Sequence, residues 1–262
     1  MKKLNKKIIY KLVIIIVIVL FVDLFSGKIF GKLYQSCKSG ICSQENYIMN
    51  NTNQDLLVFG SSRAAYHYIP SILQDTIGMS VYNCGREGSG IYYHYGVLLS
   101  TLKRYNPKVI VLDIDYRDIY KAEGIFGTDI LKEHAPFYHQ VSHEFDSLLI
   151  LPGKKEAIKL QSNLYRYNSK VFKIITGNLV RGRDNELGFR ANNGVWKKSL
   201  TSLNQKDLKV DENKILTIKK FIEKVQKHKI KLILTVSPYY KKTIKGLYEP
   251  LVEVSNEKKL KY

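Results

Sequence analysis

The sequence has few of the features that mark several large classes of protein. Among its 262 residues are three cysteines, one tryptophan and only 23 acidic residues against 42 lysines and arginines. So few cysteines exclude a disulfide-rich scaffold, and no His and Cys residues stand at the spacing of a zinc site. Internal repeats and low-complexity tracts are absent, which excludes repeat architectures. We expect neither a metal nor a cofactor.

The shortage of acidic residues leaves a formal net charge of +19. Such a charge suits an anionic partner, which includes nucleic acid, an acidic cell-surface polymer and lipid headgroups. The lysines are spread along the chain, however, and there is no zinc-finger spacing, RNP-type motif or basic helix with base-reading residues. We therefore expect a solvated, lysine-rich surface and no nucleic-acid role, which leaves room for an anionic envelope setting.

The N-terminus has the pattern of a membrane anchor. Residues 1–7 carry four lysines and form a basic tail, and residues 8–25 are almost wholly apolar. Eighteen helical residues span roughly 27 Å, about the thickness of the hydrocarbon layer. No small-x-small cleavage site follows, so we expect an uncleaved anchor at 8–30 that contacts membrane lipid. More lysines precede the segment than follow it, which favours an inside N-terminus and an extracytoplasmic main domain; the alternative is a buried core helix.

Residues 31–54 are predicted to be a linker, because Gly, Ser, Asn and Gln are frequent there. Two of the three cysteines, Cys37 and Cys42, lie in this segment. Their spacing does not fit a redox Cys-x-x-Cys motif. A small disulfide loop is plausible if the segment lies outside the cytosol, and two free thiols are equally plausible.

From residue 55 onward, apolar strands alternate with amphipathic helices. We predict strands at 55–60, 79–83, 108–114 and 229–236, and helices at 70–77, 91–105, 211–227 and 247–257. Residues 116–209 are less regular and are predicted to be an insertion, with one helix at 154–170 and a loop-rich stretch at 177–194 over the strand ends. Alternating strands and helices indicate an α/β fold with a parallel sheet that is covered on both faces.

Polar and small residues follow three of the predicted strands. They are Gly60-Ser61-Ser62, the run from Asn83 to Gly90, and Asp113 with Asp115. Parallel α/β sheets bind ligands beyond the carboxyl ends of their strands, where these segments should meet. A serine at such a strand end is a candidate nucleophile, and the alternative is an ordinary turn between a strand and a helix.

These blocks resemble the SGNH/GDSL hydrolase superfamily, particularly its membrane-anchored bacterial members that act on cell-envelope glycans. In the Gly-Asp-Ser-Leu block of the family the third position is the nucleophile; Gly60-Ser61-Ser62-Arg63 matches it, with Ser62 in that role and Ser61 in place of the aspartate. The second block is matched by Asn83 and by Gly88, whose N–H would join that of Ser62 in the oxyanion hole. The resemblance implies a three-layer α/β/α, flavodoxin-like fold over residues 55–262.

The match to the remaining blocks is incomplete. Asp115 stands where the family has an oxyanion-stabilising asparagine, and a carboxylate there would repel negative charge unless it were protonated or turned away. The family's Asp-x-x-His block, which supplies the base, is missing, and none of the six histidines replaces it convincingly. We expect the chain to be a C-terminally truncated version of a longer protein.

The resemblance implies a membrane-anchored serine esterase or O-acyltransferase that acts on acyl groups of envelope glycans or on another ester substrate. Ser62 would attack the ester carbonyl, and the acyl-enzyme would then pass its acyl group to water or to a sugar hydroxyl. Asp115 and the missing histidine favour an alternative, a catalytically inactive envelope protein that keeps the fold for binding or scaffolding.

Overall fold

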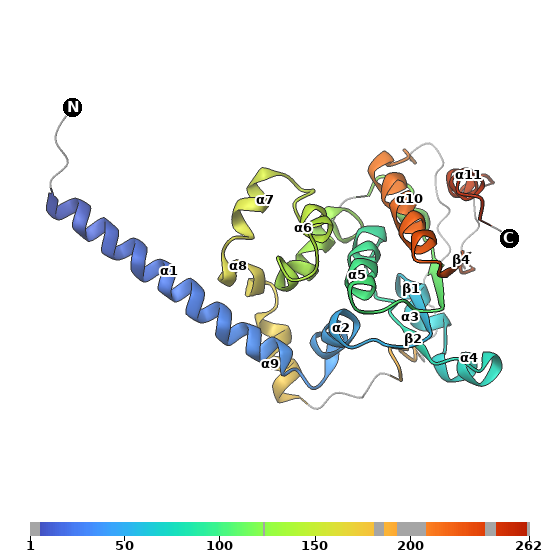
Figure 1. Ribbon diagram of the computed structural model, residues 1–262, viewed down its shortest axis with the longest axis horizontal. Coiled ribbons are helices and arrows are strands. Elements are labelled where there is room, and N and C mark those ends of the chain that lie inside the picture. Colours follow the sequence, from blue (N-terminus) through green and yellow to red (C-terminus); the bar gives the residue numbers. More distant parts are fainter. Residues whose placement is uncertain (1–5, 123, 181–185, 193–207, 239–244, 261–262) are drawn as a thin grey trace, which may run out of the picture.

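The computed structural model describes residues 6–122, 124–180, 186–192, 208–238 and 245–260. Figure 1 shows an α/β body from which one long helix projects.

The centre of the body is a four-stranded parallel sheet with the strand order β2-β1-β3-β4. Its strands are β1 (Leu56–Gly60), β2 (Val81–Asn83), β3 (Val109–Asp113) and β4 (Lys231–Thr235). Every residue of β1, β2 and β3 is buried, as expected for apolar runs in a covered parallel sheet. Gly60 lies opposite Asp113, which lies opposite Thr235, so three strands end at one level. The predicted parallel α/β sheet is confirmed.

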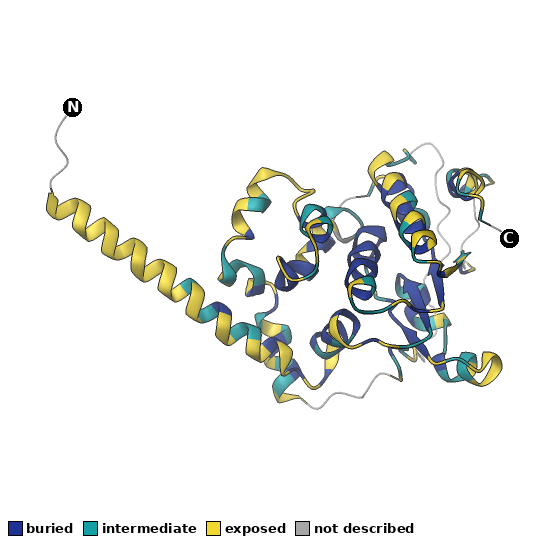
Figure 2. Cartoon of the chain, viewed as in Figure 1, coloured by how far each residue is buried: buried dark blue, intermediate teal, exposed yellow. Residues whose placement is uncertain are grey.

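Helices pack against both faces of this sheet because its side chains alternate between the faces. They are α3 (Ser62–His67), α4 (Pro70–Ile77), α5 (Ile91–Arg104), α10 (Glu212–Lys227) and α11 (Glu249–Glu257). Val58 and Val111 belong to a small core that Tyr68 and Leu73 of the α3–α4 segment cover. On the other face, the sheet joins a larger core that includes the buried sides of α5 and α10 (Figure 2).

Two helix ends follow the sequence closely. Asp211 caps α10, since its carboxylate accepts the backbone N–H groups of Asn213 and Lys214. The helix α4 stops at Gly78, which has a left-handed backbone conformation with φ of 66°. Both ends agree with the predicted positions.

The N-terminal helix α1 (Lys6–Gln35) is long and apolar enough to cross a membrane, with a mean hydropathy of 2.9 over its best 18-residue window. Its first half is exposed along its whole length (Figure 2). The second half packs against the body through one face, which contains Asp23, Gly27 and Tyr34.

The segment 31–54, predicted as a linker, is instead mostly helical. Helix α1 continues to Gln35 and α2 (Gly40–Asn50) follows. The reason is burial: Ile48 and Met49 of α2 lie in the main core, which composition alone did not reveal. A disulfide joins Cys37, in the connection that follows α1, to Cys42 of α2.

The insertion contains short helices. They are η1 (Tyr116–Asp118), η2 (Gly124–Phe126), η3 (Thr128–Phe137), α6 (His143–Leu149), α7 (Lys154–Lys159), α8 (Asn163–Asn168) and α9 (Val171–Leu179). The single helix predicted at 154–170 is thus wrong. Ser162 interrupts it, because its hydroxyl accepts the N–H of Tyr165 and caps α8. Of the stretch at 177–194, residues 181–185, 193 and 194 lie outside the described residues; the Leu187 carbonyl pairs with the Asn83 N–H along β2.

Candidate functional site

The turn from β1 into α3 is sharp, and it presents Ser62. Gly60 has φ of 150°, and a Cβ there would lie 2.7 Å from the Ala64 Cβ and 2.8 Å from the Asp113 carbonyl oxygen, so only glycine fits. Ser61 is buried at the N-cap of α3, and Ser62 is half-buried. Within the described residues the Ser62 hydroxyl has no hydrogen-bond partner.

The loop after β2 lies against this turn. The Arg86 N–H donates to the Gly60 carbonyl at 3.0 Å, and a Cβ on Gly85 would lie 2.5 Å from the Ala65 nitrogen. Gly88 follows with φ of 66°, which a glycine adopts without strain. The segments that carry Ser62 and Gly88 are therefore neighbours at the carboxyl end of the sheet, as the sequence predicts.

The side chain of Asn83 stabilises the turn that follows β1. Its side-chain Nδ2 donates to the carbonyls of Ala64 and Tyr68, both at 2.8 Å, and its Oδ1 accepts the Gly85 N–H. The side chain is fully buried. Asn83 therefore connects the first loop, which follows β1, with the second loop, which follows β2. Its side-chain amide is not left over for a ligand.

Asp115 is ionised and neutralised by two arginines. Its Oδ2 lies 3.2 Å from an Arg63 nitrogen, and its Oδ1 lies 2.8 Å from the Arg117 Nε. Although burial opposes ionisation, the bonds to Arg117 and the charge of Arg63 lower the pKa of Asp115 below its ordinary value. Besides protonation and turning away, which the sequence suggests, pairing with arginine is a third way to remove the repulsion of this carboxylate.

Arg63 joins three strand ends at this rim. Besides Asp115, its guanidinium donates to the carbonyls of Ile114 at 3.1 Å and Ser237 at 2.7 Å. Asp113 in turn accepts the N–H and the hydroxyl of Ser237. Sequence reasoning placed Arg63 near the site but missed this clamp, because nothing local shows that β4 lies beside β3.

Asp118 connects the second loop with the third loop, which follows β3. Its carboxylate accepts the backbone N–H of Ile91 at 2.7 Å and that of Asp115 at 2.9 Å. Burial and the nearby Asp115 raise the pKa of Asp118 to about 7. No separate role was predicted for this residue, although its place three residues after Asp115 fits the capping box that they form.

His94 is bonded to a serine, but this pair cannot activate a nucleophile. The Ser89 hydroxyl donates its only proton to the Arg86 carbonyl at 2.7 Å, so the His94 Nε2, 3.2 Å away, must be the donor to Ser89. Both residues are buried, and burial lowers the pKa of His94 to about 3. The neutral imidazole therefore fixes the second loop.

The other histidines bond to other partners or are exposed. The His134 ring bonds to the Tyr93 carbonyl, His139 pairs with Asp146, and His228 contacts Asn106 at the amino end of the sheet. His67 and His143 are exposed. In the part of the chain that the structure describes, no imidazole bonds to the Ser62 hydroxyl, and no cluster of three metal-ligating side chains is present.

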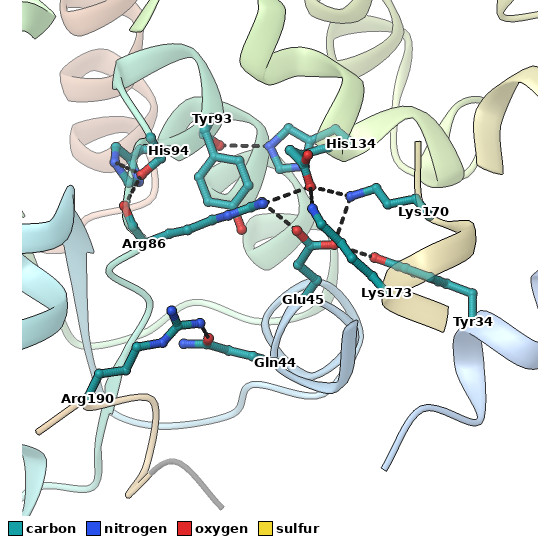
Figure 3. Close-up of polar contacts among 12 residues, drawn as sticks. Tyr34, Gln44, Glu45, Arg86, Tyr93, His94, His134, Lys170, Lys173 and Arg190 are labelled. Carbon is teal, nitrogen blue, oxygen red and sulfur yellow. Dashed lines mark hydrogen bonds and ion pairs between the residues drawn. The ribbon is translucent and has the colours of Figure 1, made fainter. Parts of the chain in front are cut away.

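A buried ion cluster holds Arg86 of the second loop in place (Figure 3). Arg86 reaches Glu45 at 2.5 Å and Glu133 at 2.7 Å. Lys170, which is 0% exposed, contacts both carboxylates, and Lys173 lies 2.7 Å from Glu133. The Tyr34 hydroxyl of α1 also donates to Glu45, so the cluster links the candidate site to the N-terminal helix. These residues come from five separate segments, which explains why no sequence motif identifies them.

Comparison of the chain with protein-family models, with curated proteins and with solved structures finds no match.

Proposed function

We propose that the chain is an SGNH/GDSL-like serine esterase or O-acyltransferase, anchored in the cell membrane, that acts on acyl groups of cell-envelope glycans. In this proposal the body is the three-layer, flavodoxin-like fold of that superfamily. Ser62 is the nucleophile, and the N–H groups of Ser62 and Gly88 hold the oxyanion. Each such donor lowers the barrier by on the order of 3 kcal/mol.

The observation that carries the proposal is the turn at Gly60. It holds a partly exposed serine hydroxyl at the carboxyl end of an internal strand, the place where parallel α/β sheets bind ligands. The glycine-rich second loop lies directly against it. Gly60 and Gly88 both have a positive φ, which glycine adopts without strain, so both loops can turn sharply at this edge of the sheet.

The disulfide supports an extracytoplasmic body. Disulfides persist in oxidising compartments and are rare in the cytosol, and Cys37–Cys42 lies immediately after α1. The lysines of residues 1–7 favour a cytoplasmic N-terminus. The disulfide and the N-terminal lysines favour the same orientation, with the body facing the envelope.

The test is labelling of the full chain in detergent with a fluorophosphonate, which reacts with activated serines, together with hydrolysis of p-nitrophenyl acetate. We expect an adduct on the peptide that contains Ser62 and loss of at least about 100-fold in hydrolysis in Ser62→Ala. Ser169→Ala, at an exposed serine next to α8, is the matched control and should keep both. An adduct on another serine, or unchanged hydrolysis by Ser62→Ala, would show that Ser62 is misassigned.

A second candidate, an inactive envelope protein that binds glycans or partners, has its own supporting observation. Within the described residues Ser62 has no base, and the place of the oxyanion asparagine holds the arginine-paired Asp115. This candidate predicts neither labelling nor hydrolysis by the wild type. The same experiment therefore separates the two.

A further inference from the structure

The body is fastened to α1 at one defined level. Both carboxylate oxygens of Asp23 accept hydrogen bonds from the start of α8: the donors are the Ser162 hydroxyl at 2.6 Å, both nitrogens of Asn163, at 2.9 and 3.0 Å, and the Leu164 N–H at 3.0 Å. One turn further along α1, Gly27 allows close contact, because a Cβ there would lie 2.3 Å from the Asn163 Cβ. The amino end of α8 therefore cannot slide along α1.

This level coincides with the outer end of the apolar run. Residues 8–25 rise roughly 27 Å in a helix, close to the hydrocarbon thickness of a bilayer. If α1 spans the membrane, as the proposed function requires, Asp23 and α8 lie at the boundary between hydrocarbon and headgroups. An element that extends from α8 toward the first half of α1 must then meet the headgroups.

Helix α7 is such an element. In Figure 1, α7 and α8 occupy the side of the body that faces the first half of α1. The side chain of Ile158 on α7 is 74% exposed, and Leu151 just before the helix is 50% exposed. Exposed apolar side chains at this level would contact water in a free body but the interfacial layer in an anchored one.

The charges beside these apolar residues are mainly positive. Lys154, Lys155 and Lys159 of α7 are all exposed, against the single acid Glu156. Among the described residues neither Lys154 nor Lys155 has an ion-pair partner, whereas Lys159 lies 3.5 Å from Glu156. Lysines interleaved with apolar residues on a short helix are typical of segments that lie on anionic lipid.

A hollow beside α7 has a size that suits a headgroup. It has a volume of about 260 Å³ and lies between η3 and α7. Lys132, Lys155 and Lys159 line it together with Asp129 and Glu156, over an apolar floor that includes Leu131 and Leu149. The lining has a surplus of one positive charge, so a singly charged phosphodiester would neutralise it.

We propose that Leu151 and α7 form a second membrane contact, which binds the anionic phosphate headgroups of the leaflet from which α1 emerges. The inference rests on the proposed membrane-spanning role of α1. A membrane contact at α7 would also orient the candidate site, because α3 and α4 lie at the opposite end of the body from α7 (Figure 1). Two contacts, at α1 and at α7, fix the body so that the Ser62 rim faces away from the bilayer, where envelope glycans are.

The test uses single cysteines that carry an environment-sensitive fluorophore on the full chain, reconstituted in vesicles with spin-labelled lipid. Labelling is selective, because in the described chain Cys84 is buried and the other two cysteines form a disulfide. The probe goes at Ile158→Cys, with Ile72→Cys on α4 as the matched control at a 58% exposed isoleucine. A third probe, Ile14→Cys within the apolar run of α1, reports insertion itself.

In vesicles that contain roughly one-third phosphatidylglycerol, we expect quenching at positions 14 and 158 and about threefold weaker quenching at position 72. Replacing Lys154, Lys155 and Lys159 by Gln, or using phosphatidylcholine alone, should at least halve the quenching at position 158 and leave position 14 unchanged.

Each alternative outcome identifies the step that fails. Quenching at 14 without quenching at 158 overturns the α7 contact and leaves the anchor intact. Absence of quenching at both positions overturns the anchor and the contact together. Quenching at 158 that ignores lipid charge and the lysine replacements overturns headgroup binding. A fluorescence change at 158 with dextran sulfate but not with vesicles would show that an acidic polymer is the ligand.

Discussion

Replacing Lys170 by methionine tests whether the buried ion cluster holds the body together. The ammonium group is 0% exposed and contacts Glu45 at 2.9 Å and also Glu133. Methionine keeps most of the apolar volume, so the substitution removes the charge and its hydrogen bonds with little change in packing. The effect of the lost charge can therefore be calculated separately.

The expected magnitude follows from the charges that remain. The cluster holds two carboxylates against Arg86, Lys170 and Lys173, so the variant keeps two charges of each sign. Overall balance limits the penalty, but among the described residues Glu45 keeps only Arg86 and the Tyr34 hydroxyl as partners in a buried site. Loss of one partner of a buried pair costs about 3–5 kcal/mol, and we expect the lower end, about 3 kcal/mol. For a body of this size that lowers Tm by about 6–12 °C.

The measurement is thermal and urea unfolding of the full chain in detergent, followed by near-ultraviolet circular dichroism of its 19 tyrosines. Lys132→Met is the matched control, because Lys132 is 53% exposed and its contact with Asp129 is 3.5 Å long. It should cost less than about 0.5 kcal/mol. A double-mutant cycle with Glu45→Gln should give a coupling energy of about 1 kcal/mol or more. A loss below about 1 kcal/mol in Lys170→Met would refute the account of a dry, tightly coupled cluster.

Three further predictions concern pH, the turn at Gly60 and the contact between α1 and α8. Burial lowers the pKa of His94 to about 3, below its ordinary value of 6.5; only the unfolded state then gains a proton between these values, so stability should fall as the pH drops from about 6.5 to about 3. The unfolding free energy, measured by urea titration from pH 6 to 4, should fall less steeply with pH in His94→Asn than in the wild type, by about 1.4 kcal/mol per pH unit. An equal pH dependence in the two proteins would contradict the neutral, buried ring. Gly60→Ala should cost about 2–5 kcal/mol in the same titration at neutral pH, against almost nothing for Ser169→Ala, because its Cβ meets Ala64 and Asp113. Gly27→Leu should force α8 from α1, seen as faster hydrogen exchange in 163–168, whereas the exposed Leu24→Ala should leave exchange unchanged.

The local pattern of the chain was enough to predict the sheet. Buried parallel strands need continuous apolar runs, and 55–60 and 108–114 contain them, so β1 and β3 could be located within one or two residues. The approach of the Ser62 turn to the Gly88 loop was predictable for the same reason, since the carboxyl ends of neighbouring parallel strands must meet. Helix ends with a strong local signal, such as Asp211 and Gly78, were also predictable.

The partners of the polar side chains were not predictable. Asp115 looked unfavourable in sequence because Arg63 reaches it from α3, more than 50 residues earlier in the chain, and because Arg117 pairs with it only through the turn that Asp115 caps. Residues 31–54 looked like a linker because their polar composition hides one buried face. Residues 154–170 looked like one helix because the sequence does not show that the Ser162 side chain bonds to the backbone and starts a new helix there.

The amino-acid sequence by itself determined the long apolar N-terminal helix, the alternation of strands and helices and the sheet edge at which a serine, glycines and acids gather, because these depend on hydrophobic periodicity and backbone stereochemistry. Only the tertiary structure decided which charges are neutralised, where the insertion lies on α1 and how Arg86 is tied to Tyr34 through Glu45. The contacts between Asp23 of α1 and α8 join residues up to 141 positions apart, and their energy depends on burial, which exists only once the chain has folded.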